Sequence, residues 1–125
     1  MTSGRPPKGP HRGDAGEDLA CAHLRARGMK VLARNYRCRS GEIDIVADDG
    51  GTLVFVEVKE RRGGSHGWAV EAVTAVKRQK IVRAAHVYAA THGLSDSPVR
   101  FDVLAIDWSA EGPRVRHDAG AFGEV

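Results

Sequence analysis

The sequence predicts an α/β fold in which a central mixed β-sheet is flanked by helices. Residues 14–28 and 74–93 show helical periodicity, and apolar runs typical of strands lie between these segments and after the second one. This order of elements is typical of helices packed against one sheet. We expect a single domain over residues 14–125, because a chain of 125 residues suits one core and shows no internal repeat.

Composition narrows the class of protein. Hydrophobic content is 42%, charged content is 28%, and no apolar run approaches the roughly 20 residues that a membrane span requires, so a membrane-spanning protein is excluded. Residues 1–13 are rich in Gly, Pro and basic side chains and are expected to form a disordered tail. They lack the apolar stretch of a secretory signal, which makes a cytoplasmic location the expectation. The 19 basic residues exceed the 16 acidic ones and admit nucleic acid as a partner.

The first predicted helix is "DAGEDLACAHLRARG". Asp14 is suited to cap its N-terminus and Gly28 to end it. Glu17 has two interpretations. It stands three residues after Asp14, as in a capping box, but it also begins the apolar stripe that continues through Cys21 and Leu24.

A strand is expected from about residue 29 to residue 38, followed by "GEIDIVADDGGTLVFVEVKER" at residues 41–61. The "DDGG" at 48–51 indicates a hairpin between two apolar strands. A two-residue loop at 49–50, or a four-residue loop at 48–51, would pair Asp44 with Phe55 and place four charges on one face of the sheet. These charges are Glu42, Asp44, Glu57 and Lys59. A loop of three or five residues without a bulge would separate them.

In the favoured register the β-carbons of Asp44 and Glu57 are diagonal neighbours about 7 Å or less apart. Two half-buried carboxylates at this separation repel each other unless one is protonated or a cation lies between them. Mg²⁺ accepts such oxygen ligands, and Lys59 on the same face could position or deprotonate a water molecule. The alternative is a solvated strand face with ordinary surface ion pairs. Leu53 and Phe55 on the charged face indicate instead that this face is covered.

The rest of the chain completes the sheet and its second helix. The glycine-rich residues 63–67 predict a mobile loop, and residues 68–73 a short helical turn. The long helix is capped by Thr74, stopped by Gly93 and directs Ile81, Ala85 and Tyr88 towards a core. "PVRFDVLAIDWS" predicts a strand, and "RVRH" at 114–117 a last short one.

These residues carry a resemblance to a known family. "EIDIVA", a turn and "LVFVEVKER" resemble the core of the PD-(D/E)xK nucleases, with Asp44 as the first acidic residue and Glu57-Val58-Lys59 as the ExK element. The longer stretch from about residue 16 to residue 106, with "AF" at 121–122, is similar to the YraN family of small bacterial proteins. The resemblance implies a restriction-endonuclease-like core, similar in fold to archaeal Holliday junction resolvases.

The same resemblance implies roles for individual residues. Asp44, Glu57 and Glu17 would hold Mg²⁺ or Mn²⁺, with the backbone carbonyl of Val58, and Lys59 would be the catalytic lysine. Glu42 stays outside this set. Five basic residues would contact phosphates or form ordinary solvated surfaces: Arg34, Arg37, Arg39, Lys77 and Lys80.

Asp102 matches a family position, but it could equally pair with Arg100 or Arg83. His66 lies in the predicted loop and is a candidate general base, but a loop histidine more often has no catalytic role.

The function implied is metal-dependent hydrolysis of DNA phosphodiesters, with branched DNA such as Holliday junctions or flaps as substrate. Resolvases of this fold act as symmetric dimers, so a homodimer is the expectation by analogy. The main alternative is a nucleic-acid-binding adaptor that keeps the fold without cleavage. A weaker alternative is a protein-interaction domain.

Overall fold

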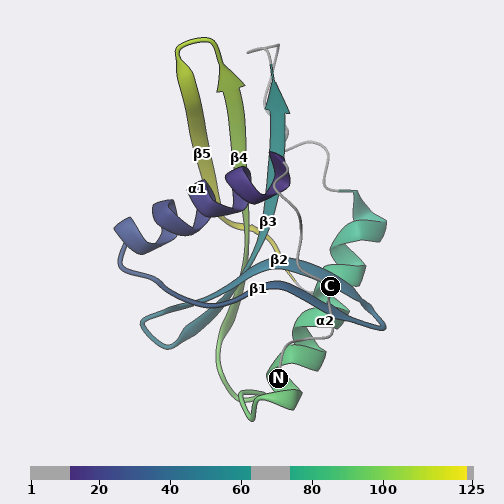
Figure 1. Ribbon diagram of the computed structural model, residues 1–125. Coiled ribbons are helices and arrows are strands. Elements are labelled where there is room, and N and C mark those ends of the chain that lie inside the picture. The colour runs from purple at the N-terminus through teal and green to yellow at the C-terminus, as the bar shows by residue number, and fades with distance from the viewer. Residues whose placement is uncertain (1–11, 63–73, 124–125) are drawn as a thin grey trace.

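The computed structural model describes residues 12–62 and 74–123, which form one five-stranded mixed sheet between two helices (Figure 1). In chain order the elements are α1 (Arg12–Ala26), β1 (Lys30–Cys38), β2 (Gly41–Asp49), β3 (Thr52–Arg62), α2 (Ala75–Thr91), β4 (Val99–Ser109) and β5 (Gly112–Phe122). The strand order in the sheet is also β1-β2-β3-β4-β5, with β3 and β4 parallel and all other neighbours antiparallel. The predicted fold class is therefore confirmed.

Each helix covers one face of the sheet. The α1 face buries Cys21 and Leu24 of the helix against alternate residues of β2, β3 and β4, including Ile45 and Val56. The α2 face buries Ile81, Ala85 and Tyr88, as predicted, against a row that includes Phe55. This division explains the near-continuous apolar sequence of β3, since both of its faces are covered.

The helix boundaries agree with the sequence at three ends out of four. Thr74 caps α2 by accepting a hydrogen bond from the backbone N–H of Lys77 at 3.2 Å. Gly93 follows the end of α2, and Gly28 follows the end of α1. The cap predicted at Asp14 is wrong, because α1 already begins at Arg12. In the described part of the chain, neither helix has the length and apolar character needed to cross a membrane.

The hairpin between β2 and β3 differs from the predicted register by two residues. Gly50 and Gly51 form the loop, both with positive φ (61° and 104°), and Asp49 pairs with Thr52. Two consecutive left-handed residues make the turn that best matches the twist of a hairpin, and glycine adopts this conformation without strain. The predicted pairing of Asp44 with Phe55 is therefore wrong. A shift of two residues equals the strand period, so within the paired part of the hairpin it leaves the side chains on their predicted faces.

The strands β2 and β3 separate beyond this hairpin. Their ladder ends at Ile45↔Val56, although both strands continue, and β2 turns away together with β1 (Figure 1). Alternation on β2 is interrupted at the same point, because Ile43 packs on the α2 side and Ile45 on the α1 side. The sheet therefore opens at Asp44, and we call the gap between β2 and β3 at this level the strand fork.

Other sequence expectations have mixed outcomes. The short strand expected at 114–117 is part of the longer β5. Both cysteines, Cys21 and Cys38, are free thiols. The disordered tail was expected over residues 1–13, but residues 12 and 13 belong to α1. Residues 1–11, the glycine-rich loop with His66 and the helical turn at 68–73 lie outside the described residues.

Candidate metal and phosphodiester site

The strand fork gathers the acidic residues that the sequence singled out. Asp44 and Glu57 directly adjoin the last pair of the β2–β3 ladder, Ile45↔Val56, and both line one pocket. Both side chains are withdrawn from solvent, and Glu57 is only 4% exposed. The predicted convergence of Asp44 and Glu57 is thus present, with a different register from the one expected.

Asp44 occupies the place where a backbone acceptor on β2 would continue the ladder. Its Oδ2 accepts a hydrogen bond from the backbone N–H of Val58 at 2.8 Å. The N–H and C=O of one strand residue point to the same edge, so the carbonyl of Val58 is also directed into the fork. The side chain of Val58 packs on the α1 face.

The electrostatics of Asp44 differ from those of an ordinary surface carboxylate. Burial, and next the negative charge of Glu57, raise the pKa of Asp44 from 3.8 to about 7. The hydrogen bond from Val58 and the charge of Lys77 act in the opposite direction without cancelling this effect. Near neutral pH, a cation in the fork would therefore compete with a proton for Asp44.

Two lysines supply positive charge to Glu57. Lys77 of α2 places its Nζ 2.5 Å from Oε2 of Glu57, and Lys59 places its own Nζ 3.7 Å from the same oxygen. Burial opposes the charged form of Lys77, but its hydrogen bond with Glu57 prevails and raises its pKa. The sequence predicted Lys59 at this place. It assigned Lys77 only to phosphate contacts.

Glu17 approaches the fork from the opposite layer. It is buried in α1, well inside the helix, so the capping-box interpretation is wrong. Its Oε1 accepts hydrogen bonds from the Asn35 amide at 2.7 Å and from the Arg34 guanidinium at 3.4 Å. Glu17 lines the same pocket as Asp44 and Glu57, a space of about 610 Å³.

Asn35 is a site residue that the sequence analysis missed. It lies on β1 between residues paired with Ile43 and Ile45, and therefore opposite Asp44. Its φ of 54° falls in the left-handed region, which asparagine tolerates better than most residues and which turns its side chain towards Glu17. An asparagine within a strand was the available signal, because asparagine is depleted in strands.

The five predicted phosphate contacts fall into different surroundings. Arg34 forms ion pairs with two carboxylates of α1, Asp18 at 2.8 Å and Glu17 at 3.4 Å. Arg37 lines the pocket and lies 3.5 Å from Glu42. Arg39 is exposed in the turn between β1 and β2, and Lys80 is exposed on α2. The start of β2, just after the turn with Arg39, packs against α2, since a Cβ at Gly41 would lie 3.3 Å from the carbonyl oxygen of Lys80.

The donor set at the fork fits a hard divalent cation. Mg²⁺ is held in proteins by one or two carboxylates, with water completing its coordination, and Asp44, Glu57 and the Val58 carbonyl meet this requirement. Over residues 12–62 and 74–123, no three His, Cys, Asp or Glu side chains are gathered as a metal cluster. Glu17 lines the same pocket, and its role as a further ligand stays a prediction.

Sequence comparisons identify the relatives of this fold and site. The profile of the Uncharacterised protein family UPF0102 matches residues 16–106. The chain belongs to the UPF0102 family. A UPF0102 protein of Symbiobacterium thermophilum is 50% identical over 100 residues, 80% of this chain and 85% of the relative. UPF0102 proteins of Frankia casuarinae and Geobacter metallireducens are 50% and 46% identical, each over 88% of this chain and over 94% and 90% of the relative.

The UPF0102 match spans every residue of the strand fork, from Glu17 to Lys77, and extends into β4. The resemblance to the YraN family is thereby confirmed at the level of family membership.

Proposed function

We propose that this UPF0102 protein is a metal-dependent DNA endonuclease that hydrolyses phosphodiester bonds at the strand fork, with branched DNA as its substrate class. The observation that supports the proposal most strongly is the meeting of the half-buried Asp44 and the buried Glu57 with two lysines in one pocket. Such a set matches what phosphodiester hydrolysis needs: oxygen ligands for a cation and fixed positive charge for the reacting phosphate.

Each residue has a defined task in this proposal. Asp44, Glu57 and the Val58 carbonyl would hold Mg²⁺ or Mn²⁺, which supplies Lewis acidity and an activated water when bound. Lys59, 19% exposed beside Glu57, would orient the attacking water or stabilise charge on the phosphate oxygens. Glu17, held by Asn35, would accept a hydrogen bond or a proton at the α1 side of the pocket.

The exposed basic residues at the rim would follow the DNA backbone. Arg37, Arg39 and Lys80 are exposed and lie near the start of β2 or on the first half of α2. Contacts from such residues to phosphates would give recognition of shape and a strong dependence on salt. A four-way junction has two-fold symmetry, so we further propose that two chains act together on it.

The test is a panel of labelled four-way junctions, flaps, single strands and linear duplexes incubated with Mg²⁺ or Mn²⁺. Wild-type protein should cleave at least one branched substrate, while Lys59→Ala and Asp44→Asn should lower the rate about 100-fold or more. Lys30→Ala, an exposed lysine at the start of β1, is the matched control and should leave the rate unchanged. Absence of cleavage together with absence of Mn²⁺ binding by calorimetry would refute the nuclease proposal.

One observation favours the adaptor alternative. Lys77 and Lys59 already neutralise Glu57, so the fork can fold without a metal ion. In that case the protein would bind branched DNA with the same salt dependence in EDTA and in Mn²⁺, and Asp44→Asn would bind it at least as tightly as wild type. A nuclease requires cation binding that is lost in Asp44→Asn.

A further inference from the structure

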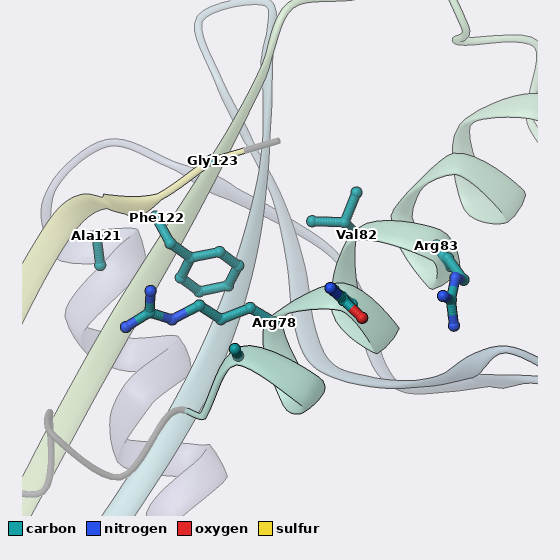
Figure 2. Close-up of a pocket in the computed structure, with 8 residues that line it drawn as sticks. Arg78, Val82, Arg83, Ala121, Phe122 and Gly123 are labelled. Atoms are coloured by element: carbon teal, nitrogen blue, oxygen red, sulfur yellow. The ribbon is translucent and has the colours of Figure 1, made fainter. Parts of the chain in front are cut away.

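A second concave surface lies next to the strand fork, on another flank of α2. This groove encloses about 420 Å³, a size in the range of ligand sites, between the first half of α2 and the end of β5 (Figure 2). Among the residues that the structure describes, its lining has two arginines and no carboxylate: Ala75, Arg78, Gln79, Val82, Arg83, Ala121, Phe122 and Gly123. This part of the groove is therefore positively charged and has an aromatic wall.

That wall is the surface end of a row of rings. Phe55 in the core stacks with Phe101 at a centroid distance of 5.6 Å, and Phe101 stacks with Phe122 at 5.2 Å, with interplanar angles of 27° and 21°. The guanidinium of Arg78 lies over the ring of Phe122, 5.8 Å from its centroid, as Figure 2 shows. Phe122 is thus packed from behind against two buried rings and faces the exposed Arg78.

We propose that this groove holds an unpaired base of a DNA strand, stacked on Phe122 and covered by Arg78. Aromatic rings and guanidinium planes are the two surfaces on which proteins stack unpaired bases. The half-buried Val82 offers an apolar contact to the edge of the base, and Arg83 one turn further along α2 offers a charge for the adjoining phosphate. A base inserted between Phe122 and Arg78 would extend the existing row of stacked rings by one member.

The charges and the position favour a DNA strand over other ligands. The two arginines of the described lining complement a phosphate backbone, and its aromatic wall complements a base. Arg78 directly follows Lys77, which contacts Glu57 at the fork. The same turn of α2 therefore contributes a side chain to the fork and another to the groove. A DNA strand bound at the fork would continue towards the groove, where its next unpaired base would bind. The assignment of this ligand to DNA rests on the proposed nuclease function.

The test measures binding without cleavage. In EDTA, the affinity for a duplex with a short single-stranded tail is compared with that for the blunt duplex, and 2-aminopurine in the tail reports stacking by quenching. Phe122→Leu and Arg78→Gln should lower the affinity for the tailed duplex about five- to fiftyfold and leave the blunt duplex unaffected. Phe122→Trp should restore both affinity and quenching. Arg25→Gln, an exposed arginine on α1, is the matched control.

The outcomes separate this proposal from the nuclease proposal. If no substrate is cleaved with Mg²⁺ or Mn²⁺, yet Phe122→Leu abolishes the preference for the tail, the nuclease proposal fails and the groove assignment stands. If folded Phe122→Leu and Arg78→Gln keep the wild-type preference and quenching, the groove assignment is wrong, whatever the cleavage result. A free nucleoside monophosphate that binds as tightly as the tailed duplex would likewise overturn the assignment to a strand. If Phe122→Leu does not fold, Arg78→Gln and Phe122→Trp decide the question by the same criteria.

Discussion

Asp44 and Asp102 are both strand carboxylates withdrawn from water in the same sheet, but their surroundings are opposite. Burial and the neighbouring charge of Glu57 raise the pKa of Asp44 to about 7. Burial also opposes ionisation of Asp102, but hydrogen bonds from His117, Arg100 and the backbone of Gly120 outweigh it and lower its pKa to about 2. The difference lies in what the protein places around each carboxylate.

The partners of Asp102 come from β4 and β5 and use both of its oxygens. His117 Nε2 lies 2.7 Å from Oδ2, the Arg100 guanidinium donates to both oxygens at 2.9 and 3.1 Å, and the Gly120 N–H donates to Oδ1 at 3.0 Å. Arg100 also reaches Asp49 at the hairpin turn. Asp102 is therefore a structural anchor between strands, which decides its role in favour of pairing with Arg100.

Burial of a carboxylate alone thus does not mark a functional site. The protein neutralises Asp102 with its own groups, whereas Asp44 faces a second carboxylate and keeps an unfavourable charge that a bound cation would relieve. Removing the charge of Asp102 should therefore lower the free energy of unfolding, and removing the charge of Asp44 should raise it.

The largest effect is expected at Asp102. Asp102→Ala should lower the free energy of unfolding at pH 7 by about 3–5 kcal/mol, because it removes one partner of a buried, hydrogen-bonded ion pair. A carboxylate with a lowered pKa stabilises the fold above pH 4, and this contribution is lost as the pH falls towards 2. Urea unfolding at pH 7 and at pH 3 measures both. A loss below about 1 kcal/mol at pH 7 would show that the anchor is dispensable.

The next effect has the opposite sign. An acid with a raised pKa destabilises the folded state as pH rises from about 4 to about 7, since the folded protein holds its proton more tightly than the unfolded chain does. Asp44→Asn lacks this charge and can still accept the Val58 hydrogen bond. In urea unfolding, the free energy of unfolding of Asp44→Asn should therefore exceed that of wild type by about 2–4 kcal/mol at pH 8. The difference should be much smaller at pH 5. Equal stability of the two proteins at pH 8 would mean that Asp44 is already neutralised.

Much of the fold was accessible from the sequence because local signals determine it. Two glycines specify the hairpin turn, and alternation with period two predicts Asp44, Glu57 and Lys59 close together whether or not the register shifts by two residues, and all three line one pocket. The register itself was not predictable, because "DDGG" permits several loops with the same parity. The polar residues of β5 show no clear alternation, so that strand was predicted too short.

The strand fork could not be predicted, because it depends on contacts distant in sequence. Where β2 leaves β3 is decided by its pairing with β1, and the left-handed Asn35 appears only in that pairing. Lys77 was recognised as a basic residue on a helix, but its reach to Glu57 depends on how α2 packs across the sheet. Sequence therefore predicted the chemical groups of the site, and tertiary packing determined their partners.

The smallest effect distinguishes two roles for Lys77. Its ammonium shares Glu57 Oε2 with Lys59 and stands where positive charge is required when no metal ion is bound. If Lys77 competes with the cation, Lys77→Met should tighten Mn²⁺ binding at pH 8 about three- to tenfold by calorimetry, because Glu57 is released from an ion pair of modest strength. Lys80→Met, an exposed lysine one turn further along α2, controls for the loss of general positive charge. Weaker Mn²⁺ binding in Lys77→Met would instead mean that the lysine orients Glu57 for the ion. Of the two carboxylates Asp44 and Glu57, only Asp44 would then have to release a competing group, its proton, when a cation binds.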